Sequence, residues 1–153
     1  LCFVRRGIYG NLFALAHSQI EEKDPLRFFV TQSGEIVVNP VIYSHSEHPI
    51  YDAQGCMSYP DEPMKQSVEC YNKINVKFQT VRKKEDGKLV LSPMIDAEYK
   101  HLNSKVFQHE ISHANGVYIY DSDYSAERAI LFGDGVVFTE DQLDRMYIYE
   151  KDK

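Results

Sequence analysis

The fold class that the sequence predicts is α+β, with antiparallel strands surrounding one central helix. Short β-branched or alternating segments, separated by glycine- and proline-containing turns, fill most of the chain before Ala97. From about Ala97 the apolar residues follow a helical period, and Asn115-Gly116 is a typical helix stop. With 153 residues, 43% of them hydrophobic, we expect a single domain over residues 1–153.

The first expected strands form a pair. Phe28–Val30 and Glu35–Val38 are rich in β-branched and aromatic residues, and residues 32–34 supply the turn between them. Asn39-Pro40 is expected to end the second strand, since proline cannot donate to a strand ladder. Residues 43–66 are expected to be mostly loop, because several prolines and a glycine interrupt them.

A longer strand and its return strand come next. Apolar and polar residues partly alternate over 68–81, which predicts one half-buried strand. Asp86-Gly87 is a hairpin turn sequence, and 88–91 is expected to pair back onto the first strand.

The last third of the chain contains the expected central helix, from about Ala97 to Asn115. A strand is expected over 117–120, and a hairpin is expected where Gly133-Asp134-Gly135 divides an apolar stretch. Residues 139–142 have capping-box spacing and predict a last short helix toward Tyr149.

Charge and composition exclude several classes of partner. The formal net charge is −6, and the one tight basic cluster, Arg82-Lys83-Lys84, is followed by two acids, so we expect no direct nucleic-acid binding. No apolar run has the length of a membrane span, so we expect no membrane partner. Cys2, Cys56 and Cys70 are too few and too scattered for a disulfide scaffold, which fits a reducing compartment.

The most informative segment for function is His109-Glu110-Ile111-Ser112-His113. On a helix, His109 and His113 lie one turn apart on one face, where two imidazoles can bind one divalent metal. The Glu110 carboxylate then lies close enough to accept a proton from a metal-bound water. The alternative is a polar surface helix that carries two unrelated histidines.

Two histidines leave a catalytic metal one protein ligand short. Downstream of His113 there is no further histidine, and Glu127 is a candidate third ligand. Upstream, Cys56 lies in a glycine-containing loop and its thiolate is the other candidate. The alternative for Cys56 is a small buried hydrophobic residue.

Three motifs in order give the chain a family resemblance. Gln108–Gly116 is similar to Gln-His-Glu-x-Asp-His-Leu-x-Gly, and Gln54–Ser58 is similar to Glu-Gly-Cys-Leu-Ser. Leu12–Gln19 is a weaker match to Gly-x-Gly-Leu-Ala-Ala-x-Gln. On these motifs the chain resembles the peptide deformylases over roughly residues 12–121, with an N-terminal segment that looks shortened.

The resemblance implies an activity and a metal centre. The family hydrolyses the N-formyl group from the initiator Met of nascent polypeptides, so N-formyl-Met peptides would be the substrates. Carried over by position, Cys56, His109 and His113 would hold one divalent metal ion. That ion is usually Fe²⁺ in the family, with Zn²⁺, Ni²⁺ or Co²⁺ as substitutes.

The resemblance also implies the roles of three further residues. Glu110 would be the general base that takes a proton from the metal-bound water and returns it to the leaving amine. The side-chain amide of Gln19 and the backbone N–H of Met57 would donate hydrogen bonds to the tetrahedral oxyanion.

The first motif departs from the family pattern. Leu12 and Ala14 stand where the family has glycines, and His17 stands where it has alanine. These side chains narrow the space for a substrate backbone. Two alternatives to an active deformylase therefore remain: an impaired deformylase-like protein that binds metal or formyl peptides, and a metallopeptidase that uses Glu127 as third ligand.

Two further departures concern the surroundings of the metal. Gln54 replaces the family's glutamate and Cys70 stands where the family tends to have arginine, so we expect a neutral environment around the cysteine loop. Ser112 replaces an aspartate, which predicts altered hydrogen bonding around the ligands and no loss of metal.

The end of the chain bears on partners and location. Some family members dock on the ribosome through a basic C-terminal helix, but residues 140–153 mix acids and bases, so ribosome docking is expected to be weak or absent. We expect a cytoplasmic location, or a mitochondrion or other organelle if a targeting segment has been removed.

Overall fold

The computed structural model describes residues 2–5, 11–16, 27–31, 34–55 and 62–131, together with 139 and 141; of 2–5 and 11–16 it describes the backbone. The strands are β1 (Cys2–Arg5), β2 (Asn11–Ala16), β3 (Phe28–Thr31), β4 (Ile36–His45), β5 (Ile50–Gln54), β6 (Lys65–Cys70), β7 (Lys73–Gln79), β8 (Val81–Lys83), β9 (Leu89–Leu91) and β10 (Ile95–Lys100). The helices are α1 (His101–Ala114) and α2 (Ala126–Ile130).

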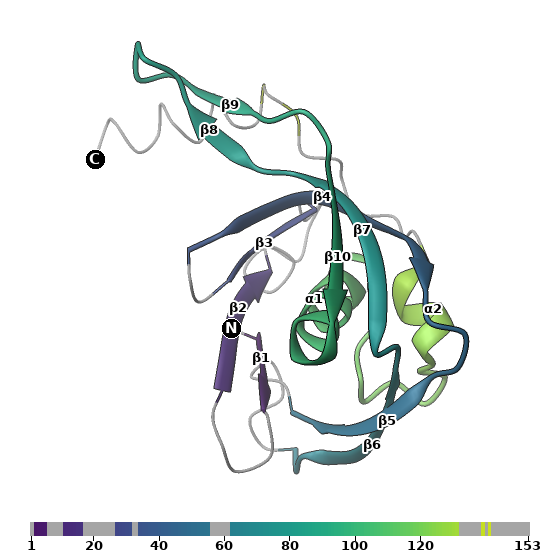
Figure 1. Cartoon of the computed structure of the whole chain (residues 1–153). Coiled ribbons are helices and arrows are strands. Elements are labelled where there is room, and N and C mark those ends of the chain that lie inside the picture. Colours follow the sequence, from purple (N-terminus) through teal and green to yellow (C-terminus); the bar gives the residue numbers. More distant parts are fainter. Residues whose placement is uncertain are drawn as a thin grey trace.

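The strands form one large sheet and two hairpins around α1. The large sheet has the order β1-β2-β3-β4-β7-β10 and is antiparallel throughout, while β5 pairs with β6 and β8 with β9. Figure 1 shows α1 in the middle of the molecule, with β1 and β2 on one side of it and β7 and β10 on another. The predicted α+β fold with a central helix is therefore confirmed.

The core forms where the inward face of the sheet meets α1. On β7 the side chains of Ile74, Val76 and Phe78 are buried while Lys77 is exposed, which confirms the predicted alternation. Phe107 of α1 packs among aromatic rings of the sheet, and its ring stacks on Tyr99 with centroids 3.9 Å apart. The main cluster comprises Phe29, Val37, Ile42, Tyr71, Ile74, Val76, Phe78, Val106, Phe107, Ile111 and Ala126.

The expectation that Asn39-Pro40 ends a strand is wrong, because β4 continues through it to His45. The strand takes up the proline in a bulge: its pairing with β7 shifts register between Val38 and Val41, and Asn39 has a φ of 52°. The Asn39 side chain also donates to Oε1 of Gln79 on β7 at 2.9 Å, which holds the two strands together at the bulge.

The loop expected over 43–66 and the single strand expected over 68–81 are both wrong in part. Two strands, β5 and β6, lie within or overlap the first segment and pair as an antiparallel hairpin. The second segment divides into the end of β6, the whole of β7 and the first residue of the short β8. The expected hairpin at Asp86-Gly87 is confirmed, with Gly87 at a φ of 85° between β8 and β9.

The central helix begins later than expected. Residues 95–100 form β10, which pairs with β7, and α1 begins only at His101, whose φ of 55° marks the change of direction. Tyr99 matched the helical pattern because its side chain packs on Phe107 from the strand. The expected stop is confirmed, since Asn115 caps α1 and Gly116 follows with a φ of 73°.

The segment after α1 also differs from expectation. Residues 117–120 form no strand: 117–118 are irregular and 119–120 form a turn, although Val117 and Ile119 are buried. The helix α2 was not expected; Ser125 caps it by accepting a hydrogen bond from the backbone N–H of Arg128. The expected hairpin at 133–135 and the expected last helix lie outside the described residues. Neither α1 nor α2 is long and apolar enough to span a membrane.

Candidate metal and catalytic site

The polar residues of the last turns of α1 are buried. His109 and His113 are each 2% exposed and Glu110 is 0% exposed. A polar surface helix would leave these side chains in water, so that interpretation is wrong. Burial of two imidazoles and a carboxylate on one short segment is costly in free energy unless these groups form hydrogen bonds or ion pairs with one another or with a bound group.

The two histidines lie together, as their spacing predicts. Their ring centroids are 5.0 Å apart with the planes at 64°, and the His113 ring also contacts Tyr118 in a T-shaped arrangement at 4.8 Å between centroids. This neighbourhood follows directly from the helical i, i+4 spacing.

The strand β5 supplies a hydrogen-bond partner for one histidine. Nδ1 of His109 lies 3.0 Å from Oε1 of Gln54, and both side chains are buried. An amide oxygen only accepts, so Nδ1 carries the hydrogen and donates it. In this tautomer the lone pair is on Nε2, and a hydrogen bond from the other ring nitrogen is common among metal-binding histidines.

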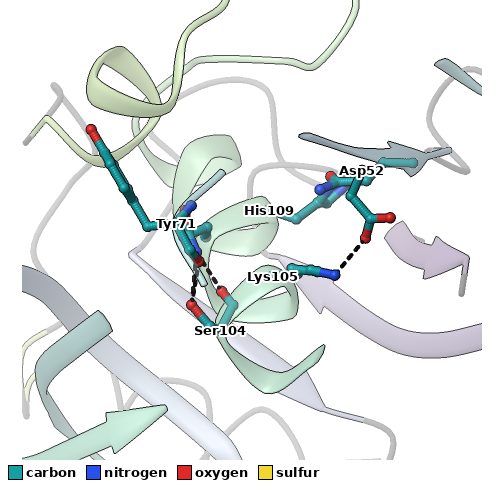
Figure 2. Close-up of polar contacts among 7 residues, drawn as sticks. Asp52, Tyr71, Ser104, Lys105 and His109 are labelled. Carbon is teal, nitrogen blue, oxygen red and sulfur yellow. Dashed lines mark hydrogen bonds and ion pairs between the residues drawn. The ribbon is translucent and has the colours of Figure 1, made fainter. Parts of the chain in front are cut away.

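A second polar network fixes the neighbouring face of α1. Gln108 accepts a hydrogen bond from the backbone N–H of Tyr71 at 2.8 Å and donates to the Tyr71 carbonyl at 2.6 Å. Ser104, one turn earlier, donates to the same carbonyl at 2.8 Å. Figure 2 shows Ser104 and Tyr71 joined in this way. The helix is thereby attached to the turn between β6 and β7.

Ser112 is buried and its hydroxyl donates to the backbone carbonyl of His109 at 2.6 Å. The hydroxyl therefore bonds within the helix.

An ion pair beside Gln54 was missed by the sequence reasoning. Nζ of Lys105 lies 2.8 Å from Oδ2 of Asp52, and Figure 2 shows this pair next to His109. The sequence clue is one of spacing: Lys105 precedes His109 by one helical turn, and Asp52 precedes Gln54 by one strand repeat. The expected neutral environment holds for Gln54 and Cys70 themselves, but a charged pair lies beside them.

Cys70 is a free, buried cysteine at the end of β6. Burial raises the pKa of its thiol to about 11, and the nearby Lys105 ammonium lowers that pKa by less than burial raises it. The thiol is therefore neutral at physiological pH and behaves as a small hydrophobic residue.

The remaining predicted site residues fall into two groups. Cys56, Met57, Gln19 and His17 lie outside the described residues. Leu12 and Ala14 lie on β2, where Leu12 pairs with Val4 and Ala14 with Thr31.

The alternative third ligand, Glu127, is an exposed residue of α2. Within 27–31, 34–55 and 62–131, no three histidine, cysteine, aspartate or glutamate side chains form a group that could hold a metal. In these residues Glu127 is therefore not grouped with His109 and His113, and its role as a third ligand stays a prediction.

Comparison with known proteins places the chain in a family. A family model described as polypeptide deformylase matches residues 6–129, so the chain belongs to that family. The peptide deformylase of Thermotoga neapolitana is 32% identical over 108 residues, which are 69% of this chain. The chain spans 59% of the length of that relative.

Solved structures show the same fold. The peptide deformylase from Thermus thermophilus superposes with a TM-score of 0.52 at 23% identity, over 91% of this chain and 69% of that one. PDF from the Vibrio parahaemolyticus bacteriophage VP16T, solved in complex with actinonin, gives a TM-score of 0.50 at 30% identity over 69% of each chain.

Proposed function

We propose that this protein is a metal-dependent hydrolase that removes the N-formyl group from the initiator Met of nascent polypeptides. Family membership supports the reaction class. The observation that carries the proposal is the buried set of His109, Glu110 and His113, in which Nδ1 of His109 contacts the side-chain oxygen of Gln54. The proposed location is the cytoplasm, and the proposed substrates are N-formyl-Met peptides.

The donor set fits a divalent metal. His109 and His113 are adjacent and buried on one face, and Cys56 follows in sequence, by two residues, the Gln54 side chain that contacts His109. Cys56, His109 and His113 would therefore hold the ion, with Fe²⁺ as the proposed native metal and Zn²⁺, Ni²⁺ or Co²⁺ as substitutes. When bound, the ion would supply Lewis acidity toward water and the formyl oxygen.

The protein's own groups would move the proton and stabilise charge. The Glu110 carboxylate would accept a proton from the attacking water and deliver it to the nitrogen of the leaving amine. The Gln19 side-chain amide and the Met57 backbone N–H would donate to the oxygen that becomes negatively charged. Both donors are neutral, so their donation does not depend on pH.

The decisive experiment is an anaerobic assay of formate release from a formyl-Met peptide, with Fe²⁺- or Co²⁺-loaded protein. The wild type should turn over, and Glu110→Gln should lose activity by about 10²- to 10⁴-fold while it keeps its metal. Glu127→Gln is the matched control, because this exposed carboxylate should affect neither turnover nor metal content. A wild type that holds metal without turnover would contradict the proposal.

The second candidate is a deformylase-like protein that binds metal or formyl peptides without turnover. The observation that favours it lies on β2, where Leu12 and Ala14 stand at positions that are glycine in the family motif. Calorimetry of formyl-peptide binding to the metal-loaded protein would test this candidate. A protein of this kind would bind the peptide without releasing formate, whereas a protein with no function toward formyl peptides would not bind it.

A further inference from the structure

Two contacts join β5 to one ridge of α1 at matching intervals. Asp52 and Gln54 are two residues apart on the strand, and Lys105 and His109 are four residues apart on the helix. A strand advances about 6.6 Å in two residues, and a helix about 6 Å in four. The pairs Asp52–Lys105, at 2.8 Å, and Gln54–His109, at 3.0 Å, therefore form two successive cross-links.

The ridge continues to the second histidine. Lys105, His109 and His113 occupy successive i, i+4 positions on α1, so they line one side of the helix. The lysine thus lies one turn before the first proposed ligand, and Figure 2 shows its ammonium directed to Asp52.

The ion pair is more sheltered than others in the described residues. The side chains of Lys105 and Asp52 are 19% and 36% exposed, whereas those of Lys100 and Glu98, whose charged atoms are 3.3 Å apart, are 57% and 41% exposed. A sheltered pair with a short contact fixes geometry better than a pair in water, which is worth little.

The position of β5 along α1 is weakly set by its other contacts. β5 is not part of the large sheet, and its pairing with β6 is irregular between Asp52 and Gln54. The register of β5 along α1 is therefore not set by a regular ladder at this point. That register determines whether Gln54 lies opposite His109.

We propose that Asp52 and Lys105 are a positioning pair for the metal centre: their ion pair sets the register of β5 along α1 and thereby keeps Gln54 on His109. This inference rests on the proposed function, because it assumes that these residues hold the metal. The pair acts through Gln54 and the strand, and it touches neither substrate nor metal.

The test uses the full chain and two readouts that do not depend on turnover. The Zn²⁺ dissociation constant is measured by competition with a chromophoric chelator, and the His109 ring tautomer by ¹⁵N NMR. Asp52→Asn and Lys105→Met should each weaken Zn²⁺ binding by about 10-fold. Both should also broaden or shift the His109 Nδ1 resonance, because the hydrogen bond to Gln54 is loosened.

Three further variants make the result interpretable. The double variant Asp52→Asn with Lys105→Met leaves no uncompensated charge and should be no weaker for Zn²⁺ than the worse single variant, because the two residues act as one unit. Lys105→Arg should retain most of the affinity. Lys100→Met, which breaks only the exposed pair with Glu98, should leave both readouts unchanged.

The outcomes separate this inference from the proposed function. A lower melting temperature with unchanged Zn²⁺ affinity and unchanged His109 tautomer would show a merely structural role and overturn the positioning pair. Cys56→Ser tests the centre itself: if it keeps wild-type Zn²⁺ affinity, the proposed ligand set fails whatever the variants at positions 52 and 105 do.

Discussion

Gln54 shows how a neutral residue can serve a position where the family resemblance implies a glutamate. His109 needs only a hydrogen-bond acceptor at Nδ1, and the amide oxygen of Gln54 supplies it at 3.0 Å. A carboxylate would accept the same bond but would bring a negative charge into a position that is 2% exposed. The neighbouring Asp52 already provides one negative charge, and Lys105 already neutralises it.

Gln54→Glu should therefore destabilise the metal-free protein. A buried carboxylate without a cation of its own costs on the order of 2 kcal/mol in the free energy of unfolding. The measurement is thermal and urea unfolding of the metal-free variant. Gln66→Glu on the exposed side of β6 is the matched control and should leave stability unchanged. A melting temperature of Gln54→Glu equal to that of the wild type would refute the idea.

Because the Cys70 thiol is buried, we expect the free energy of unfolding to depend on pH. Burial raises the pKa of its thiol from 9.0 to about 11, so the folded protein holds this proton more tightly than the unfolded chain does. The stability linked to this proton is fully present below about pH 9 and is lost as pH rises to about 11.

Urea unfolding at pH 8 and pH 11 would measure this loss. Between these values, the wild type should lose about 2 kcal/mol more than Cys70→Ala does, because the variant has no thiol to ionise. Each protein is compared with itself at the two pH values, so the stability that Cys70→Ala loses through its smaller side chain cancels. An equal loss in the two proteins would show that the thiol already ionises freely in the fold.

At the scale of elements, α1 is attached on two adjacent sides. Ser104 and Gln108 bind the Tyr71 backbone between β6 and β7, and Lys105 and His109 bind β5. Each pair is spaced by one helical turn, so the helix presents two parallel rows of polar contacts. Its apolar residues meanwhile face the large sheet. These two rows give buried polar side chains of the helix, Ser104, Gln108 and His109, their hydrogen-bond partners.

Gln108→Leu should weaken the attachment of α1. The change leaves the Tyr71 N–H without its acceptor and removes one donor to the Tyr71 carbonyl, which costs about 2 kcal/mol in unfolding free energy. Ser104→Ala should cost less, because Gln108 still donates to that carbonyl. Urea titration of the two variants measures the difference. Equal losses, or no loss in Gln108→Leu, would show that the network does not hold the helix.

Local sequence patterns predicted correctly those elements that are determined by residues close together in the chain. The alternation on β7, the turn at Asp86-Gly87 and the stop at Asn115-Gly116 depend on residues within a few positions of each other. β4 passes through Pro40 because its bulge is held by β7, a partner about forty residues later in the chain. Tyr99 follows a helical period although it lies on a strand, since it packs on α1 from outside.

The candidate site likewise has a part that local sequence predicts and a part that depends on contacts between distant segments. His109, Glu110 and His113 could be predicted together because helical spacing alone brings them together. The contact of Gln54 with His109 joins two separate motifs, and only the family resemblance brought these motifs into one site. The pair of Asp52 and Lys105 is non-local and belongs to no motif, so its spacing becomes informative only once β5 is known to lie along α1.

At the scale of the whole molecule, charge is unevenly distributed. The β8–β9 hairpin extends away from the body in Figure 1, and its base packs through Val81, Leu89 and Leu91 against the buried Val38. Its exposed bases and acids lie close together along the chain: Arg82, Lys83, Lys84, Glu85, Asp86 and Lys88. The chain as a whole has a net charge of −6, so the rest of the molecule repels polyanions.

The whole-chain charge predicts weak or absent binding to ribosomes. Phosphate binding requires clustered cations, and residues 140–153 contain more acids than bases. In co-sedimentation with ribosomes between about 50 and 200 mM salt, the wild type should stay in the supernatant throughout. The triple variant Glu140→Lys, Asp141→Lys, Asp144→Lys is the positive control: three acid-to-lysine changes move the net charge from −6 to 0.

This control should pellet at low salt and be released at high salt, because binding to phosphate displaces counterions. Salt-sensitive pelleting of the wild type would contradict the prediction. In that case Lys83→Glu with Lys84→Glu on the hairpin would locate the contact: loss of pelleting would assign it to the β8–β9 hairpin, and its persistence to the remainder of the chain. A protein that stays in solution would meet the proposed N-formyl-Met substrates by diffusion.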